Sequence, residues 1–346
     1  MRVLLEAHHP AHIHFWKYPV RELLEKGHKV LMIARDRDVM RRLLEAYDWI
    51  PAIVPRRRGN RNRFPLLEML ERQWLVARTI HAFRPDVVAS LMGSYTQSAR
   101  LYGIRNVIFT DTETQAFNHA IAHPFCDEIH TPYCFLKDFG HKHHRYPGLH
   151  ELSFLHPYRF KPDPEILKKY EGLQPGTYII VRMSAWNTFH DRDRSGIGKA
   201  IYPFVERFKD TCRIVLSAEE GKVPPGLEQY AIRFVPEDFH HLLGHARFVL
   251  TEGASTASEA ACLGVPSVFI NSVGELGNFK VLDGKYRLVR FFRDPEQGMP
   301  SAAAWLEELL VREDTGFTAR HRQLIQDHVD VCGYVFGFFA EKCGTT

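Results

Sequence analysis

The chain has 346 residues, of which 45% are hydrophobic and 25% charged, a composition typical of globular protein with room for two α/β domains. The formal net charge of +4 is too small to indicate nucleic-acid binding by itself, and no apolar run is long enough to cross a membrane. The six cysteines form no C-x-x-C pair, which favours reduced thiols in the cytoplasm over a disulfide framework.

Strand-like and helix-like segments alternate along the chain, which predicts parallel sheets joined by crossover helices. The opening MRVLLEAHHP is expected to form a strand and not a signal peptide, because its apolar run is too short and no cleavage-like region follows. Five prolines between residues 146 and 175 mark the expected interdomain region. The expected strands are RVLLEA, KVLMIAR, DVVASL, NVIFTD and EIHTP in the first half, and YIIVRM, CRIVLSA, AIRFV, FVLT and SVFI in the second half.

The loop after the first strand, AHHPAHIH, is rich in histidine. It is not a G-x-G-x-x-G fingerprint, which argues against binding of NAD or FAD. Histidine is a natural general base near neutral pH, and His12, near the start of the next helix, is our candidate for this role. The alternative is that the four histidines of the loop cap the helix or pack within the loop. They are His8, His9, His12 and His14.

The segment RRRGNRNR, residues 56–63, concentrates positive charge before a long amphipathic helix. One interpretation is a recognition loop for a phosphorylated, acidic or lipid-linked acceptor, which would also allow contact with a membrane surface. The other is a solvated charge run. Nucleic acid is not expected as a partner, because no aromatic side chains are interleaved. The arginines are Arg56, Arg57, Arg58, Arg61 and Arg63.

Two more strand ends of the first half carry polar groups. Gly93 and Ser94 follow DVVASL and predict a tight turn that can also contact a ligand. Asp111 and Glu113 follow the buried strand NVIFT, where carboxylates face a ligand rather than the core. These two carboxylates are candidates for proton transfer, although Asp111 can also cap the next helix.

In the second half, RMSAWNTFHD follows the strand YIIV. Arg182 at this strand end is a candidate to neutralise an anionic ligand and any negative charge that develops on it during a reaction. Ser184 and Asn187 are candidates for additional hydrogen bonds to the ligand.

The most informative stretch runs from residue 248 to residue 269, FVLTEGASTASEAACLGVPSVF. It predicts strand, small-residue turn, helix, turn and strand. The small Gly253 and Ala254 allow close approach of a ligand, and a helix opened by Ser255 and Thr256 suits a bound phosphate. Glu259 near the same helix end can accept hydrogen bonds from ribose hydroxyls. Thr256 and Glu259 also fit a helix capping box, so both interpretations stay open on spacing alone.

This stretch resembles the nucleotide-sugar signature of GT-B-fold glycosyltransferases, such as the enzyme that adds N-acetylglucosamine to lipid-linked muramyl peptide. It also resembles the non-hydrolysing UDP-N-acetylglucosamine 2-epimerases. AHHPAHIHFWKYPVRELLEKGHKVLMIAR, RMSAWNTFHD and EDFHHLLGHARFVLTEGASTASEAACLGVPSVF resemble a domain-of-unknown-function family placed near these enzymes, over roughly residues 1–290. The residues that match the signature are Gly253, Ser255, Thr256, Glu259, Leu263, Gly264 and Pro266.

The resemblance implies an α/β fold of GT-B type, with two Rossmann-like domains whose parallel sheets face a cleft. The expected parts are an acceptor domain at 1–155, a nucleotide-sugar donor domain at 156–317, and a C-terminal helix at 318–346 that packs on the first domain. It further implies that Phe234 and Val235 hold the nucleotide base, that Ala254 lies beside the ligand, and that a histidine such as His12 acts as base.

The sequence therefore predicts a metal-independent glycosyltransferase that needs no cofactor beyond a nucleotide-sugar donor, most plausibly UDP-linked. Its acceptor would be a glycan, a lipid-linked or another anionic molecule of cell-surface polysaccharide synthesis, in the cytoplasm or at the inner membrane surface. One alternative is a nucleotide-sugar 2-epimerase that uses Asp111 and Glu113. Another is a non-catalytic nucleotide-sugar-binding protein.

Overall fold

A computed structural model describes residues 1–36, 38–55, 65–184, 196–218, 223–312 and 316–342. The chain forms two compact units. The first comprises Met1–Phe154 together with Val329–Thr346, and the second comprises Leu155–His328. Each unit is an α/β structure with a parallel sheet, which confirms the predicted fold class.

The first unit is built on a parallel sheet in the order β3-β2-β1-β4-β5-β6-β7. The strand order reverses between β1 and β4, as in doubly wound sheets. Its strands are β1 (Arg2–Ala7), β2 (Lys29–Ala34), β3 (Ala52–Ile53), β4 (Val87–Ser90), β5 (Arg105–Phe109), β6 (Glu128–Pro132) and β7 (His143–Tyr146). Its helices are α1 (Pro10–Glu25), α2 (Asp38–Ala46), α3 (Pro65–Phe83), α4 (Thr96–Leu101), α5 (Ala116–Ala122) and α13 (Val331–Lys342), and α6 (Leu152–Leu155) ends at the unit boundary.

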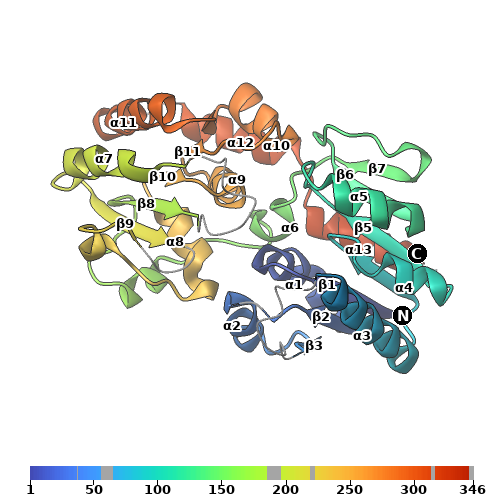
Figure 1. Cartoon of the computed structure of the whole chain (residues 1–346). Coiled ribbons are helices and arrows are strands. Elements are labelled where there is room, and N and C mark those ends of the chain that lie inside the picture. The colour runs from blue at the N-terminus through green and yellow to red at the C-terminus, as the bar shows by residue number, and fades with distance from the viewer. Residues whose placement is uncertain (37, 56–64, 185–195, 219–222, 313–315, 343–346) are drawn as a thin grey trace. The chain divides into compact units, whose positions relative to one another are not determined.

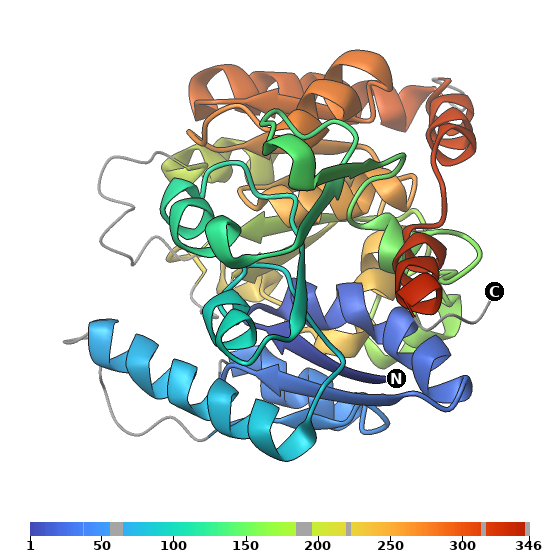
Figure 2. The same cartoon turned by 90° about the vertical axis from the view of Figure 1, so that its right-hand side faces the viewer.

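Helices cover both faces of this sheet, so its strands are buried and apolar. On one face, Val76 and Ile80 of α3 pack with Leu4 and Val88 of the strands. On the other face, the ring of Phe109 on β5 meets α1 and α13, and these two helices lie side by side (Figure 2). The apolar side of α13 thus completes the first core although the helix lies at the end of the chain.

The second unit holds a parallel sheet in the order β12-β11-β10-β8-β9, which reverses between β8 and β10. Its strands are β8 (Tyr178–Met183), β9 (Arg213–Ala218), β10 (Phe248–Thr251), β11 (Ser267–Ile270) and β12 (Val289–Phe292). Its α-helices are α7 (Ile201–Phe208), α8 (Phe239–His245), α9 (Ala254–Cys262), α10 (Gly277–Phe279), α11 (Pro295–Val311) and α12 (Phe317–Asp327).

Alternating residues of the second sheet pack against different helices, as the period of a strand requires. Val249 joins a core with Leu242 and Leu243 of α8, whereas the neighbouring Phe248 meets Trp305 of α11 edge to face at 5.9 Å. Helices α7 and α11 contact each other, and Figure 1 shows them on the same side of the sheet. Helices α8 and α9 pack together and contribute to the core that contains Val249.

Several elements differ from the sequence-based expectation. The predicted strand AIRFV forms only an isolated bridge between Ala231 and Leu216, and the chain then turns toward α8. Instead, β12 forms the edge strand beside β11. The helical segment expected from residue 318 is divided by residues 328–330 into α12, which lies in the second unit, and α13, which lies in the first.

Candidate functional site

Each sheet offers a place for a ligand where its strand order reverses. In open parallel sheets, ligands bind outside the carboxyl ends of the strands that flank this reversal. These strands are β1 and β4 in the first unit, and β8 and β10 in the second. The residues that follow these four strand ends form the candidate site, and each unit is described by itself.

In the second unit, the turn after β10 leads directly into α9. Gly253 has extended backbone geometry, with φ −96°, and its N–H donates to Thr251 Oγ1 at 2.9 Å. Helix α9 then begins at Ala254. Within the described part of the chain, the N–H groups of residues 254, 255 and 256 have no hydrogen-bond acceptor. Three amides at the positive end of a helix dipole are suited to bind an anion.

The capping box does not form at this helix. Because α9 begins at Ala254, Thr256 is its third residue rather than its cap, and Gly253 makes no side-chain capping hydrogen bond. Glu259 instead lies in the second turn, where its Oε1 is 3.3 Å from His240 Nε2 of α8. Both side chains are buried. The carboxylate predicted to bind ribose therefore has a buried imidazole as its neighbour.

Glu252 is a site residue that sequence reasoning missed. It is 1% exposed, and its two carboxylate oxygens accept the N–H groups of Ser184 at 2.7 Å and Ile197 at 2.5 Å. Its own N–H donates to Arg182 O at 3.0 Å. One buried carboxylate thus ties the end of β8 to the turn before α9. A signal was present, because a glutamate within the apolar and small-residue stretch FVLTEGA needs buried donors.

The predicted Arg182 and Ser184 come together with Gly253 through the pairing of β8 with β10. Arg182 donates to Ser217 Oγ at 2.6 Å, and its guanidinium lies 5.4 Å from the centre of the Phe239 ring. These contacts hold the cation at the carboxyl edge of the sheet, where an anionic ligand is expected.

The loop predicted to hold a nucleotide base is braced by aromatic side chains. The Phe234 ring lies 5.9 Å from the Phe239 ring, and the Val235 N–H donates to the Tyr170 hydroxyl at 3.0 Å. The same hydroxyl donates to Asp238 at 3.0 Å, and burial raises the pKa of Tyr170 to about 12. Tyr170 therefore stays neutral and can accept one hydrogen bond and donate the other.

In the first unit, the ends of β1 and β4 meet through His8. Its Nδ1 lies 3.0 Å from Oε1 of Glu6, a carboxylate on β1 with no exposed surface, and 3.4 Å from Ser94 Oγ. A carboxylate so close to Nδ1 favours a proton on that nitrogen, since two facing lone pairs would repel. The neutral ring then carries its lone pair on Nε2, where an imidazole can accept a proton.

The other histidines of this loop have different contacts. The His8 backbone N–H donates to His12 Nδ1 at 3.1 Å, so the neutral His12 ring carries its proton on Nε2 and acts as a donor there. His9 caps α1 by accepting the Ala11 N–H at 3.3 Å, and His14 stacks on Phe154 at 5.6 Å. Capping explains the position of His9, and packing explains that of His14. The assignment of His12 as the general base stays a prediction, and His8 is the alternative candidate.

Asp111 and Glu113 follow β5 at the same edge of the first sheet. Asp111 Oδ1 accepts the Thr112 hydroxyl at 3.1 Å. It does not cap the next helix, because α5 begins at Ala116 after Gln115. Glu113 is buried, and its Oε1 accepts the Leu136 N–H at 3.4 Å.

The charge of Asp111 affects the buried Tyr146 and the half-buried His150. The Tyr146 hydroxyl and His150 Nδ1 lie 3.0 Å apart. Burial and the Asp111 charge raise the pKa of Tyr146 well above its ordinary value. Burial lowers the pKa of His150, and Asp111 opposes this effect only in part. Both groups are therefore neutral near pH 7.

A comparison with known protein families identifies the family of this chain. A family model described as "Protein of unknown function (DUF354)" matches residues 1–293. The chain belongs to this family. An uncharacterized protein of Methanocaldococcus jannaschii is 24% identical over 291 residues, which cover 80% of this chain and 84% of that protein.

Solved structures with the same fold include enzymes of both types suspected from the sequence. The UDP-GlcNAc 2-epimerase of Neisseria meningitidis bound to UDP-GlcNAc matches with a TM-score of 0.67 and 11% identity, over 100% of both chains. MurG of Acinetobacter baumannii matches with a TM-score of 0.61 and 16% identity, over 98% of this chain and 99% of that one. The spinosyn rhamnosyltransferase SpnG gives a TM-score of 0.61 at 14% identity, over 97% and 99%. The resemblance to GT-B nucleotide-sugar proteins is thus confirmed at the level of the fold.

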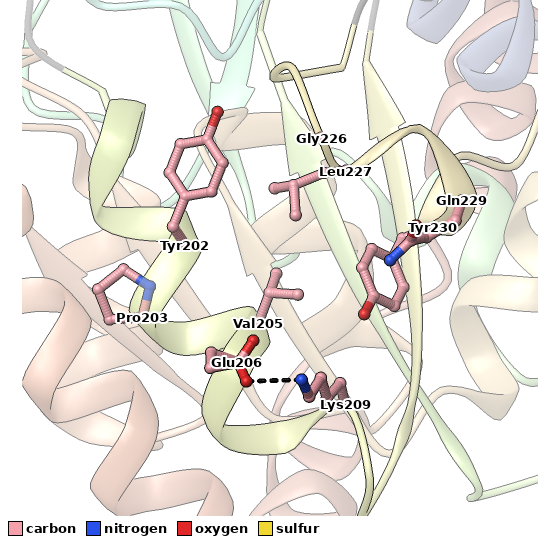
Figure 3. A pocket seen from close by; sticks show the side chains of 9 residues that line it. All are labelled: Tyr202, Pro203, Val205, Glu206, Lys209, Gly226, Leu227, Gln229 and Tyr230. Atoms are coloured by element: carbon pink, nitrogen blue, oxygen red, sulfur yellow. Dashed lines mark hydrogen bonds and ion pairs between the residues drawn. The ribbon is translucent and has the colours of Figure 1, made fainter.

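A groove of about 460 Å³ on the second unit contains none of the predicted site residues (Figure 3). Glu206 and Lys209 pair across its floor at 2.5 Å, and the Tyr202 hydroxyl donates to Pro225 O at 2.9 Å. These polar groups are already engaged within the protein, so the groove adds nothing to the candidate site.

Several sequence-based expectations concern residues that the structure does not describe. The arginines of residues 56–63 and the candidate Asn187 lie outside the described residues. Among the described residues, no three His, Cys, Asp or Glu side chains are grouped so that they could hold a metal ion. Within the same part of the chain, no helix combines the length and the apolar character needed to cross a membrane.

Proposed function

We propose that the chain is a glycosyltransferase of GT-B type that moves a sugar from a UDP-linked donor to an acceptor hydroxyl. The start of α9 carries the proposal, because its three available amides and Glu259 offer one place for a diphosphate and another for a ribose. Structures with this fold include one bound to UDP-GlcNAc and a MnaA–UDP co-structure, and both support a nucleotide ligand here.

The donor would occupy the second unit. The diphosphate would accept hydrogen bonds from the amides of residues 254–256, and the small side chains of Gly253 and Ala254 would allow its close approach. Arg182 at the end of β8 would stabilise the charge that develops on the departing diphosphate. The base would lie against Phe234 and the backbone of Val235.

The first unit would accept the proton of the acceptor hydroxyl. As the acceptor oxygen attacks the anomeric carbon, the bond from that carbon to the diphosphate breaks and UDP leaves with the electron pair. The released proton would move to His8 Nε2, while Glu6 stabilises the imidazolium that forms at 3.0 Å from its carboxylate. His12 with its Nε2–H would then serve as a hydrogen-bond donor to the substrate.

The acceptor in this proposal is a glycan, a lipid-linked or another anionic molecule of cell-surface polysaccharide synthesis. The arginine run at residues 56–63 supports an anionic acceptor and peripheral contact with the inner membrane surface.

The first test is a thermal-shift and calorimetric screen of nucleotides and nucleotide sugars on the full chain. We expect UDP and UDP-sugars to bind, and Glu259→Gln to weaken UDP binding roughly tenfold or more, because hydrogen bonds to a buried carboxylate are lost. Glu228→Gln, an exposed glutamate in the same unit, is the matched control. Absence of binding by every nucleotide to folded protein would overturn the proposal.

A 2-epimerase of nucleotide sugars is the second candidate. The buried Glu113 and the half-buried Asp111 favour it, because two carboxylates at one strand end can exchange protons with a substrate carbon. An epimerase needs no acceptor. Incubation with UDP-GlcNAc in deuterium oxide distinguishes the two, since deuterium at C2 of the sugar without any acceptor would indicate epimerisation, whereas UDP release that requires an added acceptor, with no deuterium at C2, would indicate transfer.

A further inference from the structure

The contact between Glu259 and His240 is the feature of the second unit that the proposed function does not yet use. Glu259 is 6% exposed and His240 is 2% exposed, and their Oε1 and Nε2 atoms lie 3.3 Å apart. Glu259 belongs to the second turn of α9 and His240 to α8, so the contact crosses between two helices. Like the pair of His8 and Glu6 in the first unit, it joins a carboxylate and an imidazole that are both almost fully withdrawn from water.

The surroundings of His240 restrict its ring. Phe160 meets it nearly edge-on at 6.2 Å with an interplanar angle of 76°, and the adjacent Phe239 ring lies 5.7 Å away. Phe239 in turn lies under the guanidinium of Arg182. A ring packed in this way has few alternative rotamers, so its Nε2 stays next to one carboxylate oxygen of Glu259.

The remaining acceptor positions of the Glu259 carboxylate also need hydrogen-bond donors. A carboxylate has about four lone-pair positions, and those that do not face His240 must find other donors once the site excludes water. Two vicinal hydroxyls, as on a ribose, can donate to them together. A 2′-deoxyribose supplies one donor fewer and leaves buried acceptor capacity unsatisfied, which is costly at a site built around that hydrogen bond.

The position of Glu259 along α9 suits this role. Glu259 lies five residues beyond Ala254, and the rise of a helix over five residues is about 7.5 Å. Such a separation allows the sugar of a nucleotide to lie beside Glu259 while its phosphates reach the amides at the start of the helix.

We propose that His240 is a positioning residue, which fixes the Glu259 carboxylate and thereby makes the site select ribonucleotides over 2′-deoxyribonucleotides. This inference rests on the proposed nucleotide site and narrows its donors to ribonucleoside diphosphate sugars. Deoxythymidine-linked sugars would be rejected on the same ground. A merely structural contact between α8 and α9 would leave this selectivity unchanged when His240 is replaced.

The test uses the full chain and two probes, UDP and 2′-deoxy-UDP, with affinities measured by titration calorimetry. We expect the wild type to bind UDP at least roughly tenfold more tightly than 2′-deoxy-UDP. In His240→Gln this ratio should fall below about threefold, chiefly through weaker binding of UDP. His241→Gln is the matched control, because the neighbouring His241 accepts the Asp163 N–H at 2.9 Å and should leave the ratio unchanged.

The outcomes separate the two proposals. If neither probe binds to folded wild type, the proposed nucleotide site itself fails. If both bind with a ratio near one in the wild type, or if folded His240→Gln keeps the wild-type ratio, only the role of His240 is overturned. Should His240→Gln not fold, His240→Asn and the ¹⁵N-labelled histidine spectrum of the wild type replace it. The His240 resonances should then move markedly with UDP and little with 2′-deoxy-UDP, and equal movement with both would contradict the inference.

Discussion

At the end of β1 the first unit presents a buried imidazole beside a buried carboxylate, whereas at the end of β10 the second unit presents a small-residue turn and the amides of a helix. The parallel sheets and their reversal of strand order are alike in the two units. The turn residues are not, because His8 follows the one strand and Glu252 and Gly253 follow the other. The two units therefore share an architecture and differ in the few residues that follow one strand of each sheet.

The difference suggests a division of labour. Ionisable side chains can take up and release protons, which an amide cannot do. Backbone amides and a helix dipole bind an anion without a titratable group, so their affinity for phosphate does not depend on their own protonation. In the proposed function the first unit would transfer a proton and the second would hold a diphosphate, and three experiments can break or sharpen this contrast.

The largest effect is expected from His8. In His8→Gln the side chain stays polar but cannot take a proton, so we expect UDP release from a productive UDP-sugar to slow by roughly 100-fold or more. UDP affinity, measured by calorimetry, should change less than about threefold. In His12→Gln the loss should stay below about tenfold, because its Nδ1 already accepts the His8 N–H.

The reverse order of these two effects would restore His12 as the base. If His8→Gln instead lost as much UDP affinity as turnover, His8 would contribute to nucleotide binding, and the proposed separation of proton transfer from nucleotide binding would be wrong.

An intermediate effect is expected from two glycines of the second unit. Gly264 has φ +77°, and a Cβ there would lie 2.9 Å from His321 Nδ1. We expect Gly264→Ala to lower the free energy of unfolding by roughly 1–3 kcal/mol, from left-handed backbone strain and the clash. Gly253→Ala is the matched variant, since φ is −96° and a Cβ would lie no closer than 3.5 Å to its neighbours.

Thermal denaturation should therefore leave Gly253→Ala within about 0.5 kcal/mol of the wild type, while calorimetry shows weaker UDP binding. If Gly253→Ala bound UDP as tightly as the wild type, close approach of the diphosphate to this turn would be excluded.

The smallest effect concerns the pH dependence of the first unit. Burial, together with the neighbouring His119 and His143, lowers the pKa of His123 from 6.5 to about 4. Because the unfolded chain takes up this proton first, the stabilisation from a neutral His123 is complete above pH 6.5 and is lost as the pH falls toward about 4. In His123→Phe the free energy of unfolding should therefore depend less steeply on pH in this range. The change in slope is at most that of one proton, about 1.4 kcal/mol per pH unit.

Hydrogen exchange resolved by peptide, between pH 7 and pH 4, measures this change. Protection around β6 and α5 should fall less steeply in His123→Phe than in the wild type, while α9 in the second unit behaves alike in both. An unchanged slope at β6 would mean that His123 does not contribute.

Much of the fold was predictable because its signals are local. Periodic apolar runs indicated most of the strands, and the sequence around the small-residue turn indicated that β10 leads directly into α9. AIRFV was mistaken for a strand because β-branched composition alone cannot show whether a neighbouring strand offers a partner over its whole length. The two-residue strand β3 and the edge strand β12 carried too little pattern to be recognised.

The candidate site was only partly predictable, because its central contacts join residues far apart in the chain. His240 and Glu252 had no local pattern that pointed to a ligand, and their roles depend on Glu259 and on the ends of β8. Likewise, the choice between His8 and His12 depends on which nitrogen each ring has engaged, which follows from Glu6 and from the backbone.

The sequence by itself determined the alternation of strands and helices, the strand-turn-helix that ends β10, and the set of histidines after β1, since each depends on neighbouring residues. Only the tertiary structure decided that α9 begins before Thr256, that Glu259 contacts an imidazole, and that Glu6 lies against His8. Hydrophobic periodicity acts over a few residues and can be read along the chain. Hydrogen bonds between buried polar groups depend on which strands become neighbours, and that order emerges only when the sheet has formed.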